Sequence, residues 1–314
     1  MTGTEGRKAL PHHPVLYQEI IHVIRPQRDQ KYVDGTLGAG GHAWGILKES
    51  SPDGLLLGLD VDPQALALAK ERLAEFGARA TLFQASHTTL RQQLDQVEWS
   101  LVDGIVLDLG ASSMQFDTPD RGFSFLQDGP LDMRFDPNNP MTAADLVNTW
   151  DERSLADILF TYGEERRSRQ VAKAICLARP FKSTRQLAQL VEQVVGRTPG
   201  SKLHPATRTF QALRIAVNQE LVAIEKTIPQ AVDALAPGGR LAVITFHSLE
   251  DRIVKNMFRS YSQDLRDETH PMAPVLRPAV TRLVQRKPIL PTEEEIEQNP
   301  RARSAKLRVI EKLA

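Results

Sequence analysis

From residue 32 the chain reads Tyr32-Val33-Asp34-Gly35-Thr36-Leu37-Gly38-Ala39-Gly40-Gly41-His42, a short apolar run that breaks into glycines. A second apolar run, Leu57-Gly58-Leu59-Asp60, ends in an acid 22 positions after Gly38. Glycines let the backbone turn tightly and come close to a ligand. A carboxylate at the end of the second run can accept hydrogen bonds from two ribose hydroxyls. The two runs therefore predict two strands that form a cradle for a nucleotide cofactor.

The spacing of the glycines separates two classes of cofactor. A dinucleotide site needs G-x-G-x-x-G, because a pyrophosphate must sit on a helix N-terminus, and glycines at 35, 38, 40 and 41 do not fit that spacing. Asp34, at the end of the first predicted strand, would repel a pyrophosphate but suits a cation. S-adenosylmethionine (SAM) carries an ammonium, a sulfonium and a ribose, so the cradle favours SAM over NAD. A glycine-rich turn without a ligand stays open as the alternative.

The composition is that of an ordinary globular protein. The chain has 314 residues, of which 41% are hydrophobic and 25% charged, which indicates one large domain with an insertion or two domains. No apolar run reaches the ~18 residues of a membrane span, and the N-terminus lacks the apolar core of a signal peptide. We therefore expect a cytoplasmic protein with no membrane partner.

Cysteine, histidine and charge narrow the function classes further. The single cysteine, Cys176, excludes an intrachain disulfide and a cysteine-cluster metal site. The histidines have no second ligand cluster at metal spacing, so we expect no metal. The 39 basic and 39 acidic residues balance, whereas a protein that binds free nucleic acid often has a basic excess. Local basic clusters at 166–169, 277–287 and 301–303 are equally well explained as solvated surface.

Apolar runs at 31–34, 55–60, 80–84, 104–109 and 240–246 alternate with helical patterns. This alternation is typical of a doubly wound, mainly parallel α/β sheet, and we expect 280–286 and 304–310 to close it as antiparallel strands. About 130 residues separate Asp108 from Arg240, too many for one crossover helix. We therefore expect a core of residues 1–115 and 206–314, and an inserted loop and helical domain of residues 116–205.

Residues 206–235 have the pattern of one long helix that returns to the core, because apolar residues recur there every three or four positions. Thr207, Gln211, Arg214 and Asn218 make a second, polar stripe with the same period. Solvation and a functional face explain this polar stripe equally well.

Three predicted strands end in an acid: Asp34, Asp60 and Asp108. The carboxyl ends of parallel strands meet at one edge of a sheet, where ligands bind. A buried carboxylate without a partner is costly, so three acids together favour a polar ligand. Helix capping is the alternative for each of them.

The strand at 240–246 is followed by His247-Ser248-Leu249-Glu250-Asp251, which contains the residue types of a hydrolase triad. The nucleophile elbow G-x-S-x-G is absent, which argues against hydrolysis. A ligand-facing His247 and an N-cap role for Ser248 both remain compatible with this stretch.

The motifs resemble those of the bacterial RsmH (MraW) family of methyltransferases. The resemblance rests on His12-His13-Pro14-Val15-Leu16, on the stretch from Asp34 to His42, on Asp108-Leu109-Gly110-Ala111-Ser112-Ser113, on Arg121-Gly122-Phe123-Ser124-Phe125, on Gly129-Pro130-Leu131-Asp132-Met133-Arg134 and on Tyr162-Gly163-Glu164-Glu165. It continues through residues 204–212, 246–252 and 299–304. Several of these motifs are long and unusual, so the resemblance is specific.

The resemblance implies a Rossmann-like core with a helical insertion, and SAM-dependent methylation of the N4 amine of a cytidine in 16S ribosomal RNA, at the decoding region. The implied partner is the small ribosomal subunit, and a homodimer is allowed. Two alternatives stay open: an assembly factor that retains a SAM pocket without catalysis, and an NAD-dependent oxidoreductase. Cys176 lacks a Pro-Cys context, and methylation of a pyrimidine ring carbon usually needs a cysteine nucleophile, so a nitrogen or oxygen target agrees with the sequence.

The cradle and the resemblance together assign residues to roles. Cofactor binding falls on Asp34, Gly38, Ala39, Gly40, Gly41, His42, Asp60, His87, Asp108 and Gln115. The candidate proton acceptors are Asp108 and His247. The candidates for binding the substrate are Ser112, Ser113, Arg121, Arg134, Arg208, Asn218, Ser248, Arg301 and Arg303. A paired base hides its amine, so the target cytidine must be unpaired or extruded.

Overall fold

The computed structural model describes residues 14–197, 200, 203–265 and 275–314. His12 and His13 of the first family motif lie outside these residues. The chain forms two compact units: one is made of residues 1–109 and 225–314, and the other of residues 110–224. None of the described helices has the length and apolar character needed to cross a membrane.

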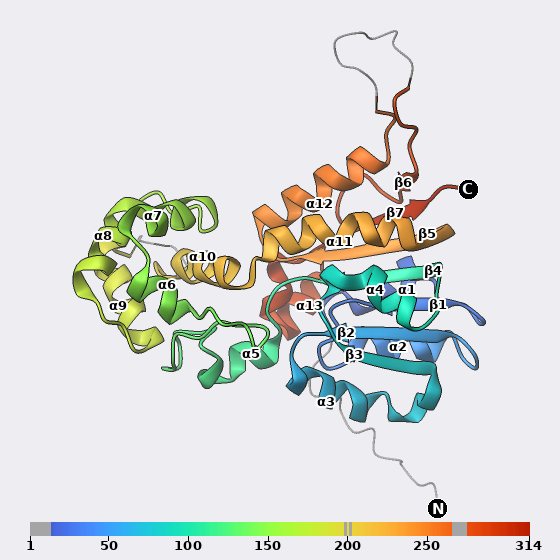
Figure 1. Cartoon of the computed structure of the whole chain (residues 1–314), viewed down its shortest axis with the longest axis horizontal. Coiled ribbons are helices and arrows are strands. Elements are labelled where there is room, and N and C mark those ends of the chain that lie inside the picture. The colour runs from blue at the N-terminus through green and yellow to red at the C-terminus, as the bar shows by residue number, and fades with distance from the viewer. Residues whose placement is uncertain (1–13, 198–199, 201–202, 266–274) are drawn as a thin grey trace, which may run out of the picture. The chain divides into compact units, whose positions relative to one another are not determined.

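A seven-stranded sheet organises the first unit, in the order β3-β2-β1-β4-β5-β7-β6 (Figure 1). Its strands are β1 (Lys31–Asp34), β2 (Leu55–Asp60), β3 (Ala80–Gln84), β4 (Val102–Asp108), β5 (Leu235–Thr245), β6 (Thr281–Leu283) and β7 (Lys306–Lys312). The first five strands in this order run parallel, and β7 runs antiparallel to both β5 and β6. The order 3-2-1-4-5 is that of a doubly wound, Rossmann-like sheet. The fold class predicted from the sequence is confirmed.

The strand predictions are accurate at one side of the sheet and less so at the other. β1, β2 and β3 have the predicted bounds. β4 begins two residues earlier than expected, and β5 begins at Leu235 because its first residues pair with Val102 before a register shift. β6 is shorter than predicted and β7 lies two residues later, since the 3-10 helix η4 (Pro300–Ser304) occupies the start of the predicted strand.

Helices cover the sheet of the first unit. They are α1 (Tyr17–Ile24), α2 (Gly41–Glu49), α3 (Pro63–Arg72), α4 (Leu90–Gln96), α12 (Ser248–Tyr261) and α13 (Glu293–Gln298), with short 3-10 turns η1 (Ala74–Arg79) and η2 (His87–Thr89). Ile20 of α1 and Ile46 of α2 pack with Val106 on one face of the sheet. Side chains alternate along a strand, so Ile105 and Leu107 point to the other face, and both are buried as well.

The second unit has a hydrophobic core of its own. It contains α5 (Ser113–Asp117), η3 (Pro119–Arg121), α6 (Ala143–Thr149), α7 (Glu152–Thr161), α8 (Ser168–Ala178), α9 (Thr184–Val195) and α10 (Thr207–Asn218). Phe210, Leu213 and Val217 of α10 join this core with residues of α6 to α9. The observed boundaries, 109/110 and 224/225, therefore differ from the expected 115/116 and 205/206, because α10 packs within the insertion.

The single helix predicted for residues 206–235 is wrong. α10 ends at Asn218, and α11 (Glu220–Ala234) begins two residues later. Gln219 between them has a left-handed backbone, with φ of 50°, which ends a helix because it turns the chain away from the helical path. The apolar spacing continues across the break, which is why the sequence pattern shows one helix.

Candidate active site

The glycine-rich turn follows β1 and is held by backbone hydrogen bonds. The Gly35 amide donates to Val106 O at 2.9 Å, and the Leu37 amide donates to Leu59 O at 2.9 Å. Gly38 and Gly40 have φ of +52° and +75°, a left-handed conformation that favours glycine. A Cβ added to Gly41 would lie 2.3 Å from Pro14 Cγ, whereas one added to Gly38 would meet only Thr36 O at 4.0 Å. Glycine is therefore required at position 41 because a side chain there would clash with Pro14. Gly38, with Ala39 beside it, forms the part of the turn that has open space around it.

Asp60, at the end of β2, holds the glycine-rich turn at Gly38 through a hydrogen bond. Its Oδ2 accepts a hydrogen bond from the Gly38 amide at 2.8 Å, and its Oδ1 accepts one from the Asp62 amide at 2.9 Å. Burial raises the pKa of Asp60 above the usual aspartate value. Each carboxylate oxygen has a second lone pair, so Asp60 can still accept hydrogen bonds from a ribose while it shapes the loop.

Asp34 and Asp108 end the neighbouring strands β1 and β4; Asp34 is buried, and Asp108 is half-buried with its Oδ1 atom buried. Asp34 is 1% exposed. Its Oδ1 accepts from the Thr36 amide at 3.2 Å. Asp34 Oδ2 and Asp108 Oδ1 have no hydrogen-bond partner within the described part of the chain. Two such atoms at one sheet edge are costly unless a ligand meets them.

The charges around these two carboxyl groups are negative. Burial, with a smaller contribution from Asp60, raises the pKa of Asp34 to about 7. Burial also raises the pKa of Asp108 well above its usual range, and the charges of Asp34 and Glu250 add to the rise. A ligand with positive charge would relieve this repulsion. The residues therefore fit SAM, whose ammonium and sulfonium are cationic.

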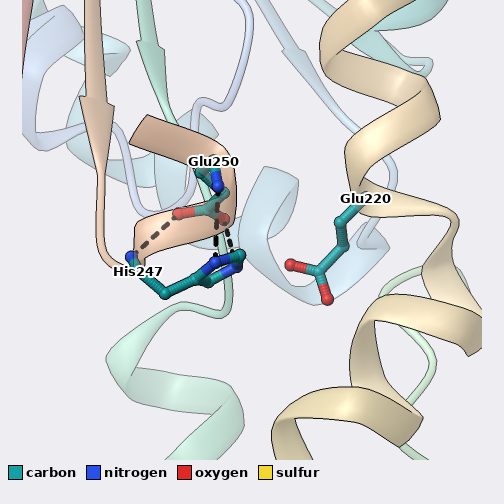
Figure 2. Close-up of side chains that lie close together, drawn as sticks. All are labelled: Glu220, His247 and Glu250. Atoms are coloured by element: carbon teal, nitrogen blue, oxygen red, sulfur yellow. Dashed lines mark hydrogen bonds and ion pairs between the residues drawn. The ribbon is translucent and has the colours of Figure 1, made fainter. Parts of the chain in front are cut away.

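His247 and Glu250 stand where β5 leads into α12 (Figure 2). The Glu250 amide donates to His247 Nδ1 at 3.4 Å, and Glu250 Oε2 accepts from the His247 amide at 3.3 Å, which makes a capping box. Glu250 Oε2 also accepts from the Phe246 amide at 2.8 Å. His247 Nε2 lies 3.2 Å from Glu250 Oε1. His247, not Ser248, is the N-cap, and Ser248 is exposed at the first turn. Nδ1 of His247 is therefore engaged in the cap of α12.

The other two candidate histidines are neutral. His42 Nε2 lies 3.0 Å from Val15 O, and burial lowers its pKa to about 4. His87 Nδ1 lies 2.7 Å from Thr227 Oγ1, and burial lowers its pKa to about 4 as well. A Cβ on Gly35 would lie 3.3 Å from His87 Cβ, so His87 borders the glycine turn. His42 instead fastens α2 to the segment before α1.

This geometry can now be compared with known proteins. A sequence profile described as the MraW methylase family matches residues 9–313. The chain belongs to this family. It is 49% identical to a protein of Syntrophobacter fumaroxidans over 98% of both chains, and 49% identical to one of Magnetococcus marinus over 96% of this chain and 99% of that one. A protein of Dehalococcoides mccartyi is 48% identical over 96% of this chain and 87% of its own. All three are named "Ribosomal RNA small subunit methyltransferase H".

In this MraW-family chain, several expected substrate residues instead hold the loop of residues 121–139. Arg134 pairs with both oxygens of Asp132 at 2.9 and 2.7 Å and donates to Pro137 O and Asn139 O. Arg121 donates to the carbonyls of Arg134 and Phe135. Four of the five N–H donors of the Arg134 guanidinium are used in these bonds, so the expected role of Arg134 in holding a phosphate is replaced by a role in holding this loop.

Asn218 is a second correction. Its Nδ2 donates to Met133 O at 2.7 Å and to Arg214 O at 2.9 Å, and its Oδ1 accepts from the Phe135 amide at 2.7 Å. Arg214, the neighbour of Asn218 on the polar stripe, pairs with Glu220 through two contacts of 2.8 Å. Glu220 is also drawn in Figure 2 and belongs to the unit of residues 110–224. Arg214 and Asn218, two members of the polar stripe, therefore have structural roles on α10.

The remaining expected residues are placed as follows. Ser112 is the N-cap of α5, and its Oγ accepts a hydrogen bond from the Gln115 amide. The Gln115 side chain in turn accepts one from the Ser112 amide at 3.0 Å, which completes a capping box. Ser113 is the first residue of that helix. Arg208 is exposed at the start of α10, and Arg301 and Arg303 are exposed on η4. These three arginines have the exposure that a phosphate contact requires.

Two further residues, Glu250 and Thr36, have structural roles at the site that their sequence context did not predict. Thr36 Oγ1 accepts from the Asp108 amide at 2.6 Å and so ties the glycine turn to the end of β4. Glu250 is fully buried and adds a negative charge beside Asp108. The spacing of His247 and Glu250, three residues apart, is the capping-box signal that could have identified Glu250. No spacing rule could have identified Thr36.

Proposed function

We propose that this chain transfers a methyl group from SAM to the exocyclic N4 amine of a cytidine in 16S ribosomal RNA, at the decoding region of the small subunit. The observation that carries the proposal is the sheet edge where Asp34, Asp60 and Asp108 surround the glycine turn. The names of the relatives and the motifs that match the family support the substrate. The proposed setting is the cytoplasm, where small subunits are assembled.

Three acids divide the binding work in this proposal. SAM, when bound, supplies a methyl group made electrophilic by its sulfonium. Asp60 accepts hydrogen bonds from the ribose hydroxyls while it holds Gly38. Asp34 and Asp108 offer the buried carboxylate oxygens that complement positive charge. His87, neutral and beside the turn, closes the cradle on the side of η2.

Asp108 is the proposed proton acceptor. The amine of cytosine is a poor nucleophile because its lone pair is delocalised into the ring, so alignment matters more than base strength. A carboxylate that accepts a hydrogen bond from the amine orients it and can take the proton that is shed. Burial raises the pKa of Asp108, and a carboxylate with a raised pKa is a stronger base that accepts the proton more readily.

The inserted unit, residues 110–224, is the proposed substrate-recognition part. Arg208 there, and Arg301 and Arg303 in the first unit, are the proposed phosphate contacts. The net charge of zero favours an assembled subunit over naked RNA as the substrate, since ribosomal proteins can share the contact. Removing the target cytidine from its stacked position in the RNA costs free energy, which the binding of the RNA to the protein must offset.

The test is to incubate the protein with SAM and small subunits that lack the modification, and to analyse the nucleosides of the digested RNA. We expect N4-methylcytidine, and its loss in Asp60→Ala. The matched control is Asp53→Ala, which removes an exposed carboxylate of the same unit. SAM binding without any methylated product would instead support the assembly-factor alternative. Protection of the fold against heat by NAD, and not by SAM, would support the oxidoreductase.

A further inference from the structure

The proposed cofactor site leaves one physical problem, which is the charge of Asp34 and Asp108. The two residues end adjacent parallel strands, with Asp34 in register with Val106 two residues before Asp108. Each has one buried oxygen without a hydrogen-bond partner in the described residues. The charge of Asp34 adds to the raised pKa of Asp108, so the two carboxylates repel each other when both are ionised.

The charged groups that act on the two carboxyl groups, among the residues that the structure describes, are themselves acids. Asp60 at the end of β2 acts on Asp34, and Glu250 on α12 acts on Asp108, and both are acids. His87 on η2 borders the glycine turn and is neutral, since burial lowers its pKa to about 4. His247 is directed to Glu250 by the capping box. The free protein must therefore neutralise part of this negative charge in some other way.

We propose that Asp34 and Asp108 hold one proton between them in the free protein and release it when the cationic cofactor binds. A proton is the smallest cation that can occupy the buried edge, and a bound ligand with positive charge takes over its electrostatic role. This inference rests on the proposed function, because it takes SAM as the ligand.

The exchange also prepares the pair for the reaction. Methylation of an amine leaves one N–H proton to be removed, and a pair that has lost its own proton can accept it. The N–H bond breaks, and its proton goes to Asp108 or, through the coupled pair, to Asp34. The pair then has the same protonation as in the free protein, which matches the neutral thioether of the product.

Isothermal titration calorimetry of SAM in two buffers with different heats of ionisation measures the released protons directly. We expect release of a large fraction of one proton per SAM near pH 6.5, and a decline towards zero at pH 9. Affinity for SAM should rise with pH by up to about tenfold per unit over the same range. Asp34→Asn and Asp108→Asn should each reduce the proton release at least twofold, whereas Asp53→Asn, which changes an exposed carboxylate, should leave it unchanged.

Each outcome decides one of the two proposals. SAM binding with equal heats in both buffers would overturn the proton exchange while leaving the proposed function intact. Full proton release in both Asn variants would also overturn it, because another group would then be the source. An infrared spectrum of the free protein near pH 6.5 needs no ligand: a protonated carboxyl band that disappears in Asp108→Asn supports the shared proton, and its absence from the wild type overturns it. A failure to bind SAM refutes the proposed function separately.

Discussion

At the scale of single residues, the structure distinguishes side chains that form hydrogen bonds to loop backbone from side chains that are available to bind a ligand. Asp34, Asp60 and Asp108 could be predicted as a group because strands that end in acids are visible in the sequence. Asn218 and Arg134 could not be assigned correctly. A polar residue at helical spacing looks the same whether it faces solvent or clamps a loop, and only the tertiary contacts with Met133 and Phe135 decide it.

The role of Asn218 gives a first prediction. Asn218→Ala removes three hydrogen bonds, two of them to the loop of residues 133–135. Each lost bond in a partly buried place costs about 1 kcal/mol or more, so we expect a loss of about 2–4 kcal/mol in the free energy of unfolding. Chemical denaturation measures it, and limited proteolysis should show earlier cleavage near residue 135.

The control for this prediction is Gln211→Ala on the same helix, which removes the hydrogen bond from Gln211 Nε2 to Tyr162 O at 2.9 Å. It should cost about 1 kcal/mol. Affinity for SAM should stay within about twofold of the wild type in both variants. A normal stability of Asn218→Ala with a large loss of RNA methylation would restore the substrate role that the sequence suggested.

At the scale of elements, apolar periodicity predicted most of the sheet and misplaced the helix breaks. β1, β2 and β3 are apolar runs bounded by turn residues, and their bounds agree with the prediction. The long helix failed at Gln219, because Val217, Leu221 and Ile224 continue the apolar spacing through a residue that is not helical. Periodicity reports which side chains are buried, and it does not report the φ angle of a residue such as glutamine.

This break gives a second prediction. Gln219 has φ of 50° and is exposed, so it bears the steric cost of about 1 kcal/mol that an L-residue has in the left-handed region. Gln219→Gly should remove that cost and, after the loss of chain entropy is counted, raise the free energy of unfolding by up to about 0.5 kcal/mol. Val222→Gly, at an exposed site inside α11, should destabilise instead. Thermal unfolding of the two variants distinguishes them, and destabilisation by both would refute the proposed role of residue 219.

At the scale of the whole molecule, RNA binding and cofactor binding are predicted to separate. Arg208 is exposed in the second unit, and the acids of the glycine turn belong to the first. Arg208→Ala should lower methylation of small subunits by about tenfold through a lost phosphate contact, and SAM affinity should not change. Arg28→Ala, which removes an exposed arginine of the first unit, is the control. Equal losses of RNA methylation and SAM affinity in Arg208→Ala would make Arg208 a structural residue.

The acids of the cradle also set how the stability of the whole protein depends on pH. The pKa of Asp34 rises from 3.8 to about 7 on folding. Between these values the folded protein holds a proton that the unfolded chain has released, so the free energy of unfolding falls as pH rises through this window. Asn at position 34 cannot ionise and is free of this dependence.

Asp34→Asn should therefore gain stability relative to the wild type as pH rises from 4.5 to 8, by an amount on the order of a few kcal/mol. Urea denaturation of the cofactor-free proteins at pH 4.5, 6 and 8 measures the difference. In Asp53→Asn the difference should stay constant from pH 6 to 8, because the hydrogen bond from the Asp29 amide, with help from Arg28, lowers the pKa of Asp53 and keeps it ionised over this range. A constant difference in Asp34→Asn would mean that Asp34 is ionised in the free protein throughout. Saturating SAM should reduce the stability advantage of Asp34→Asn at pH 8. The bound cation stabilises the ionised Asp34 of the wild type, whereas the variant has no carboxylate there to be stabilised.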